Sequence, residues 1–311
     1  MTNGLSRVLA SPIDLSPMDS IEAFRERFER AAEGLDAPGE RALVAGFVAD
    51  RVAFAFAGGY RAALGRLVRG KLDEARAARV GSICITEEGG GHPRAVKTEL
   101  RPIGEGAFEL HGRKQWATAA PFADVLLVAA STGADDQGRN RLVIVSVSAR
   151  APGVSLEKMP DPPFAPELPH AVVRLDGARV TPADVLPGDG YEAYVKPFRT
   201  IEDAHVFLAL AGHLVRVARA YGGSREAIEQ AAALSLALCA IAEMDPSSPV
   251  THVALAGALD QGRRLVEASS GVFAKAPDDV RARWERDRPL TMVAERARSE
   301  RRKKAFESLG A

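Results

Sequence analysis

Apolar residues recur at helical spacing in the first part of the chain, between residues 19 and 80. Phe24 and Phe28 lie four positions apart, and Phe47 belongs to a further run of the same kind. Spacings of three and four place such residues on one face of an α-helix. The pair Gly58-Gly59 interrupts this pattern before it resumes. The region therefore predicts helices with a break at the two glycines.

The next hundred residues have a different pattern, in which short runs rich in β-formers alternate with turn residues. Gly, Pro, Asp and Asn lie between the runs, and no helical pattern separates them. Such short, closely spaced strands predict an antiparallel β-sandwich or barrel. The expected strands are Ser82–Thr86, Lys97–Ile103, Ala107–His111, Val125–Ala130, Leu142–Val147, Val154–Lys158 and His170–Leu175.

Helical spacing returns after residue 198 and continues to the C-terminus. Gly222-Gly223 ends the first expected helix, and Ser224 is a suitable N-cap for the second. Pro289 should kink or split the last one, because proline removes a helical hydrogen bond. The expected helices cover about 198–221, 225–243, 250–270 and 278–308.

These patterns predict an α+β protein of three parts. We expect a short helical N-terminal domain at 1–80, a β-sandwich or barrel domain at 81–190 and a helical bundle at 191–311. Apolar side chains on several sides of the second bundle helix, such as Leu234, Leu236 and Leu238, predict a homodimer or a larger homo-oligomer.

Composition excludes several classes of protein. The 41 basic and 41 acidic side chains cancel, which argues against a nucleic-acid binder that relies on overall charge. The 46% of apolar residues supply a real core. We expect no membrane span, no signal peptide and no metal site, because the sequence shows no long apolar run and no His or Cys at ligand spacing. Cys84 and Cys239 are expected to be reduced and buried in a cytoplasmic protein.

Four segments of the β region carry a resemblance, and they occur in the same order and at similar spacing in one known family. Cys84-Ile85-Thr86-Glu87 precedes three glycines, and Leu110-His111-Gly112-Arg113-Lys114-Gln115-Trp116-Ala117-Thr118 follows. Ala123-Asp124 and Arg174-Leu175-Asp176-Gly177-Ala178-Arg179-Val180 complete the set. Together they resemble the β-domain of the acyl-CoA dehydrogenase family over about 100 residues.

The resemblance implies an FAD-dependent oxidoreductase that removes hydrogens from the α and β carbons of an acyl thioester such as an acyl-CoA. It places the Thr86-Glu87 segment along the flavin ring, with Thr86 and Thr118 bonding its heteroatoms and Trp116 packing on it. The protein's part is to orient and tune a cofactor that carries the redox chemistry. For Trp116 alone, the alternative is an ordinary strand core residue.

The sequence departs from the family pattern where the adenylate end of FAD is usually bound. Gly222-Gly223-Ser224-Arg225-Glu226 replaces the expected Arg-x-x-Phe-Gly segment, and Gln261-Gly262 lacks a second glycine. Gly91-His92-Pro93-Arg94 stands where a Ser-Asp pair is common, and the C-terminal segment that often carries the base is missing. We therefore expect weak FAD binding, and His92 becomes a candidate substrate contact.

A polar stripe on the helix at 198–221 supplies the remaining candidates. Glu202, His205, His213 and Arg216 fall on one side of it. This is either a solvated face or the wall of a cavity. By resemblance to members with branched substrates, Glu202 is the candidate catalytic base, and His205 one turn on is a candidate substrate contact. The alternative for Glu202 is a first-turn residue stabilised by the helix dipole.

Three functions remain open at this point. The first is the flavin-dependent acyl-CoA dehydrogenase-like activity. The second is a divergent member without FAD or catalysis that acts as a binding or assembly module, and the third is a flavin-dependent monooxygenase or another activity on the same fold. The length and branching of the acyl chain would be set by the shape of the pocket.

Overall fold

A computed structural model describes residues 3–310, and these divide into two compact units. A helical unit contains the described residues up to Ala63, the short segment Pro163–Glu167 and the chain from Thr200 onward. A β-unit contains Leu64–Pro162 and Leu168–Arg199. The prediction of three domains stays a prediction.

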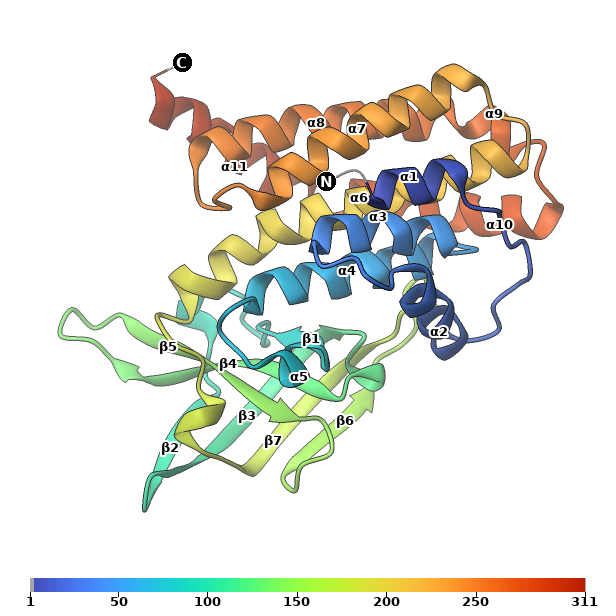
Figure 1. Cartoon of the computed structure of the whole chain (residues 1–311). Helices are drawn as coiled ribbons and strands as arrows, with labels where there is room; N and C mark the ends of the chain where they lie inside the picture. The colour runs from blue at the N-terminus through green and yellow to red at the C-terminus, as the bar shows by residue number, and fades with distance from the viewer. Residues whose placement is uncertain (1–2, 311) are drawn as a thin grey trace. The chain divides into compact units, whose positions relative to one another are not determined.

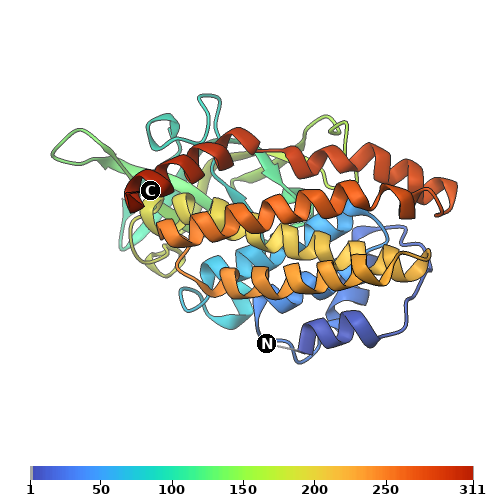
Figure 2. The same cartoon turned by 90° about the horizontal axis from the view of Figure 1, so that it is seen from above.

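The helical unit is built from helices at both ends of the chain (Figure 1). Helix α8 packs against α7 and α11, as the second view also shows (Figure 2). Helix α3 packs against α1, α2 and α7. The helices are α1 (Asn3–Ala10), α2 (Ile21–Ala31), α3 (Pro38–Val48), α4 (Val52–Val68), α6 (Lys196–Ala220), α7 (Arg225–Glu243), α8 (Pro249–Ala268), α9 (Ser270–Phe273), α10 (Asp278–Asp287) and α11 (Glu295–Leu309).

Three expected helix signals behave as predicted. The Ser224 side chain accepts from the Ala227 N–H at 3.1 Å and caps α7. Pro289 lies in a 3₁₀ turn, Arg288–Met292, that separates α10 from α11. Gly222 has a φ of 69° and lies two residues after the end of α6 at Ala220.

The expected break at Gly58-Gly59 is wrong, because α4 runs without interruption through both glycines. Their role is close packing. A Cβ at Gly59 would lie 2.8 Å from the His205 carbonyl oxygen of α6, inside van der Waals contact. Gly46 of α3 and Gly212 of α6 would each place a Cβ against the backbone of the facing helix in the same way. Absence of side chains at these positions lets the three helices approach closely.

The polar stripe on α6 is buried in this packing and is not a solvated face. His205, His213 and Arg216 are all less than 9% exposed. The His213 ring nitrogen Nδ1 lies 3.0 Å from the Ala49 carbonyl oxygen. Arg216 donates to the carbonyl oxygens of Phe47 and Asp14. The stripe therefore joins α6 to the α3–α4 corner and to the segment after α1.

The β-unit contains one seven-stranded sheet in the order β1-β4-β2-β3-β7-β6, with β5 paired to the other side of β4 (Figure 1). Its pairings are antiparallel except for β1 with β4 and a single parallel bridge between β2 and β4. These two parallel pairings are the exceptions in the predicted antiparallel β-domain. The strands are β1 (Val80–Cys84), β2 (Glu99–Gly104), β3 (Ala107–Thr118), β4 (Val125–Ala134), β5 (Asn140–Ser148), β6 (Val154–Lys158) and β7 (His170–Val180).

Strands β1 and β3 also contact each other, so the sheet curls around a core of small and β-branched side chains. Leu126, Val128, Val145 and Val173 are typical members of this core. Cys84 belongs to it and, like Cys239 in the helical unit, is a buried free cysteine. Burial raises the pKa of both thiols to about 12, so neither is reactive near neutral pH.

A buried ion pair fastens the segment after β1 to β3. The Lys114 side chain is 0% exposed, and its Nζ donates to Glu87 Oε1 at 2.7 Å. The Thr98 N–H and hydroxyl donate to the same oxygen, and the Lys97 N–H donates to Oε2. Burial by itself would raise the pKa of Glu87, but Lys114 and these donors lower it overall, so the carboxylate is charged at neutral pH.

His213 should make the stability of the helical unit depend on pH. Burial, helped by the nearby Arg216, lowers the pKa of His213 to about 4 from 6.5. The unfolded chain therefore binds more protons between these values, so stability is complete above pH 6.5 and falls as the pH drops toward 4, by up to about 3 kcal/mol. We expect His213→Gln to flatten the urea-unfolding free energy over this window.

The matched control is His92→Gln, which replaces an exposed histidine and should keep the wild-type slope between pH 6.5 and 4. Carboxylates with a lowered pKa, such as Glu87 and Asp50, lose their contribution only below about pH 4.5. An unchanged slope in His213→Gln would show that His213 is not the titrating group.

Lys114→Met should destabilise the β-unit by about 3–5 kcal/mol, because it leaves the Glu87 carboxylate buried without a cation. The double variant Glu87→Gln/Lys114→Met should lose clearly less, since no buried charge remains. Lys158→Met removes a surface pair with Asp161, both partners being more than half exposed, and should cost about 1 kcal/mol or less. Equal losses in Lys114→Met and Lys158→Met in urea unfolding would contradict this account.

Candidate functional site

The candidate cofactor residues of the β-unit lie along two adjacent backbone segments. The Ser82 hydroxyl donates to the Thr118 carbonyl oxygen at 2.8 Å, and the Gln115 N–H donates to the Thr86 carbonyl oxygen at 2.7 Å. The segment from Ser82 to Thr86 therefore runs antiparallel to the end of β3. Thr86 and Thr118 lie at opposite ends of this paired stretch. Trp116 belongs to its β3 side, two residues before Thr118.

Trp116 has two unusual features for a residue within a strand. Its φ is 57°, in the left-handed region, and its side chain is 56% exposed. The pairing of β3 with β7 shifts register between Lys114 and Ala117, which turns the indole out of the sheet. A non-glycine residue in this conformation costs about 1–3 kcal/mol, and such strain is concentrated at functional sites. The structure therefore excludes the interpretation of Trp116 as strand core.

The hydroxyl groups of Thr86 and Thr118 are available to bind a ligand. Both side chains are half-buried, and within residues 3–310 neither hydroxyl makes a hydrogen bond. Glu87 differs, because both of its carboxylate oxygens accept hydrogen bonds from Lys97, Thr98 and Lys114. Glu87 thus holds Thr86 in place, and its own contact with a cofactor stays a prediction.

His170 of β7 was not singled out by the sequence. It pairs with Thr118 in the β3–β7 register, and its ring lies edge-on to the Trp116 indole with the centroids 5.9 Å apart. Burial lowers its pKa, and among the described residues its Nδ1 atom has no hydrogen-bond partner. The strand register was the missing information, because no local motif contains His170.

His92 lies on the turn that follows the three glycines. Its Nδ1 accepts from the Arg94 N–H at 3.2 Å and caps a short 3₁₀ turn, Pro93–Ala95. The imidazole is exposed, and its centre lies 6.5 Å from the centre of the Tyr191 ring. Its assignment to the substrate stays a prediction.

Glu202 and His205 belong to the helical unit. His205 is fully buried, with Nδ1 2.7 Å from the Ile201 carbonyl oxygen, and its assignment to the substrate also stays a prediction. Asp203 forms ion pairs with Arg298 and Arg301 of α11. Glu202 beside it is half-buried and lies in the second turn of α6, which begins at Lys196. Because the helix dipole acts within the first turn, it gives Glu202 little stabilisation.

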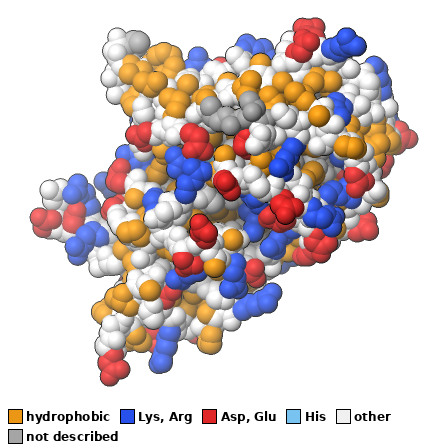
Figure 3. Space-filling view, in the orientation of Figure 1, with side chains coloured by type: hydrophobic (Ala, Val, Ile, Leu, Met, Phe, Trp, Pro, Cys, Tyr) orange, Lys and Arg blue, Asp and Glu red, His pale blue; other side chains and the backbone are white. Residues whose placement is uncertain are grey.

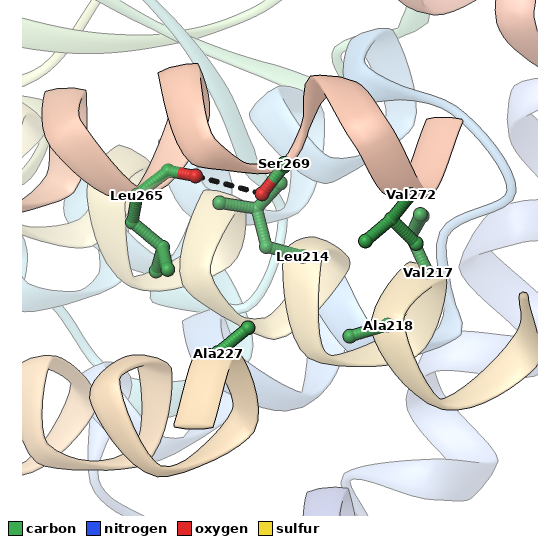
Figure 4. A pocket seen from close by; sticks show the side chains of 7 residues that line it. All are labelled: Leu214, Val217, Ala218, Ala227, Leu265, Ser269 and Val272. Carbon is green, nitrogen blue, oxygen red and sulfur yellow. Dashed lines mark hydrogen bonds between the residues drawn. The ribbon is translucent and has the colours of Figure 1, made fainter. Parts of the chain in front are cut away.

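The helical unit also contains a small apolar hollow where α6, α7 and α8 meet α9 (Figure 4). Its volume is about 10 Å³, which is at the lower limit for one water molecule. The hydroxyl of Ser269, at its wall, already donates to the Leu265 carbonyl oxygen. The hollow is therefore a packing gap and not a substrate site. It is lined by Leu214, Val217, Ala218, Ala227, Leu265, Ser269 and Val272.

Other kinds of site find no support in the described part of the chain. Within residues 3–310, no three His, Cys, Asp or Glu side chains are placed to hold a metal ion. No helix among these residues has the length and apolar character needed to cross a membrane. The face drawn in Figure 3 carries acidic and basic side chains intermixed, in keeping with their equal numbers.

Residues 82–178 match the family model of the acyl-CoA dehydrogenase middle domain. A protein of Dictyostelium discoideum described as a probable short/branched chain specific acyl-CoA dehydrogenase is 32% identical over 120 residues, which are 38% of this chain and 29% of that protein. A benzylmalonyl-CoA dehydrogenase of Aromatoleum aromaticum is 28% identical over 160 residues, covering 49% of this chain and 40% of that protein. The matches thus span less than half of each relative's length.

Solved structures share the fold over almost the whole chain. Butyryl-CoA dehydrogenase from Megasphaera elsdenii has a TM-score of 0.69 at 16% identity, covering 98% of this chain and 93% of its own. Glutaryl-CoA dehydrogenase from Mycobacterium smegmatis has a TM-score of 0.67 at 16% identity, covering 99% and 93%. The predicted α+β fold of N-terminal helices, β-domain and C-terminal helices is confirmed. Residues 82–178 thus match the middle domain of the acyl-CoA dehydrogenase family, and the chain shares the fold of the solved butyryl-CoA and glutaryl-CoA dehydrogenases.

Proposed function

We propose that the chain is a flavin-dependent acyl-CoA dehydrogenase-like oxidoreductase that acts on the CH–CH group of an acyl thioester. The observation that carries this proposal is the exposed, strained Trp116 between two threonines with unused hydroxyls. A flat aromatic ligand with polar ring atoms fits such a surface, because the indole offers stacking area and the hydroxyls offer hydrogen bonds. Relatives described as acyl-CoA dehydrogenases support the same class of reaction.

The residues of the β-unit have separate tasks in this proposal. Trp116 packs on the flavin ring, and Thr86 and Thr118 bond its heteroatoms. Lys114 and Glu87 hold the Thr86 segment against β3, so the hydroxyls are positioned before the ligand arrives. A bound flavin supplies the acceptor for the hydride that leaves the β carbon.

Glu202 is the proposed base that takes the proton from the α carbon. Its neighbour Asp203 is engaged by two arginines of α11, and the Glu202 side chain is half-buried. A bound acyl chain would desolvate the Glu202 carboxylate, and a desolvated carboxylate is a stronger base.

The form of the flavin is a separate question. The family segments that usually bind the adenylate end of FAD are missing from this sequence, so we propose FAD with weaker binding than is usual. A structural neighbour, TdsC from Paenibacillus, is described as FMN-bound; it has a TM-score of 0.63 at 18% identity. FMN is thus the natural second ligand to test. A homodimeric state and a cytoplasmic location are part of the same proposal.

Flavin binding should quench the fluorescence of Trp116 selectively. The chain has two tryptophans, and Trp284 is only 3% exposed and stacks on Phe273. Trp284→Phe therefore isolates the signal of Trp116. Titration of this variant with FAD and FMN should quench its emission, and Thr86→Val or Thr118→Val should raise the dissociation constant roughly three- to tenfold.

Thr132→Val is the matched control, because Thr132 is an exposed threonine of β4 and its loss should leave flavin affinity unchanged. Absence of quenching by either flavin, in folded protein, would favour the alternative of a family member that serves as a binding or assembly module.

Glu202→Gln should slow the bleaching of bound flavin by an acyl-CoA about 100-fold or more, because it removes the base and keeps the shape of the side chain. Stopped-flow absorbance with short, long and branched acyl-CoAs would measure this. Glu229→Gln, on the exposed side of α7, is the control and should bleach at the wild-type rate. Bleaching at the wild-type rate in Glu202→Gln would remove Glu202 from the mechanism.

A further inference from the structure

We infer that His170 is a positioning residue for Trp116, and that its imidazole ring holds the indole in the outward orientation in which it can pack on a flavin ring. The part of this inference that concerns the flavin rests on the proposed function. The contact between the two rings lies within the β-unit and can be tested without a ligand.

The backbone at Trp116 does not by itself fix the orientation of the indole. Gln115 and Trp116 together oppose the single residue Val172 of β7, which is the arrangement of a β-bulge. The Trp116 side chain is 56% exposed. An exposed side chain changes rotamer within picoseconds to nanoseconds unless a neighbour restrains it. The indole therefore needs a neighbouring side chain if it is to keep one orientation.

The ring of His170 is such a neighbour. His170 pairs with Thr118, two residues beyond Trp116, and its ring reaches diagonally to the indole. The ring centres are 5.9 Å apart, and the ring planes are inclined at 75°. Aromatic rings favour this edge-to-face arrangement, because the positive edge of one ring meets the negative face of the other. Rotation of the indole away from its outward orientation would break the contact.

The backbone of His170 is restrained on both sides. The Pro169 carbonyl oxygen accepts from the Ala119 N–H at 3.0 Å, and the His170 carbonyl oxygen accepts from the Met159 N–H at 2.9 Å. Ala119, like Trp116, has a φ of 57° in the left-handed region. Pro169-His170 therefore accepts a hydrogen bond from one left-handed residue and contacts the side chain of the other. A fixed support of this kind can hold a neighbouring side chain in place.

A restrained indole should bind a flat ligand more tightly than a mobile one. A ligand that stacks on a mobile side chain must immobilise it, and this loss of freedom weakens binding. The contact with His170 restrains Trp116 before a ligand arrives. FAD and FMN present the same ring to the indole, so His170 should favour both to the same extent.

The test compares His170→Gln, which removes the aromatic ring, with His170→Phe, which keeps one. Both are made in Trp284→Phe protein, in which Trp116 is the one remaining tryptophan. Time-resolved fluorescence anisotropy without flavin then reports the local motion of the indole. His170→Gln should increase the amplitude of its nanosecond motion about twofold or more, and His170→Phe should keep the parent value. His170→Leu, a second variant without an aromatic ring, should behave like His170→Gln.

His111→Gln is the matched control, because it removes a half-buried histidine of β3 that pairs with Glu109. It should leave the motion of Trp116 unchanged. If Trp284→Phe does not fold, fluorotryptophan can replace both tryptophans of the chain, and the fluorine NMR line width of Trp116 then reports the same motion, with Trp284 as the internal reference.

Flavin titrations complete the test. His170→Gln should raise the dissociation constants of FAD and FMN by the same factor, about three- to tenfold, and His170→Phe should restore the affinity. Unchanged motion of Trp116 in His170→Gln, or equal loosening in His170→Phe, would overturn the inference while the proposed function stands. Looser motion with unchanged flavin affinity would also overturn it, because the contact would then be structural alone. If the unmutated protein binds neither flavin but Trp116 loosens as expected, the proposed function fails and the hold of His170 on Trp116 stands.

Discussion

The buried pair of Glu87 and Lys114 is the interaction on which the candidate cofactor surface depends. The segment after β1 has few side chains of its own to bury, since three glycines follow it. Its position is set by one carboxylate that points inward and receives donors from Lys97, Thr98 and Lys114. A charge in such a place is stable only while its partners are present. The pair therefore fixes the Thr86 hydroxyl and the glycine turn relative to the end of β3.

The pair of Glu87 and Lys114 also accounts for the small residue at position 112 and for the neighbouring Thr98. Gly112 leaves room for Thr98, because a Cβ there would overlap the Thr98 side chain. Thr98 can then donate to Glu87, and Lys114 completes the pair from the buried side of the strand. Two residues later the register shift turns Trp116 outward. The resemblance of this segment to the acyl-CoA dehydrogenase family thus reflects several requirements that must be met together. They are space at Gly112, a buried cation at Lys114 and the outward turn at Trp116.

Local patterns predicted most elements of the fold, although not α1 or the unbroken helix α4. Ser224 caps a helix by a bond within three residues, and Pro289 splits one because it lacks an N–H. The seven expected strands also occur, although β3, β4 and β7 extend further than the apolar runs suggested. Contacts between distant segments were not predictable in this way. Gly58 and Gly59 look like a break from sequence alone, and only the facing helix α6 shows that they permit close packing.

The candidate site likewise contains residues that sequence segments reveal and a residue that only the folded structure reveals. Thr86, Trp116 and Thr118 were found because they belong to two recognisable segments, whereas His170 lies in neither. His170 comes beside Trp116 through the β3–β7 register. Side chains that support the site are buried and satisfied, while those that face the ligand space keep unused donors. Glu87 is thus tied to the interior by its hydrogen bonds, whereas the half-buried hydroxyls of Thr86 and Thr118 are the groups that our proposal gives to the flavin.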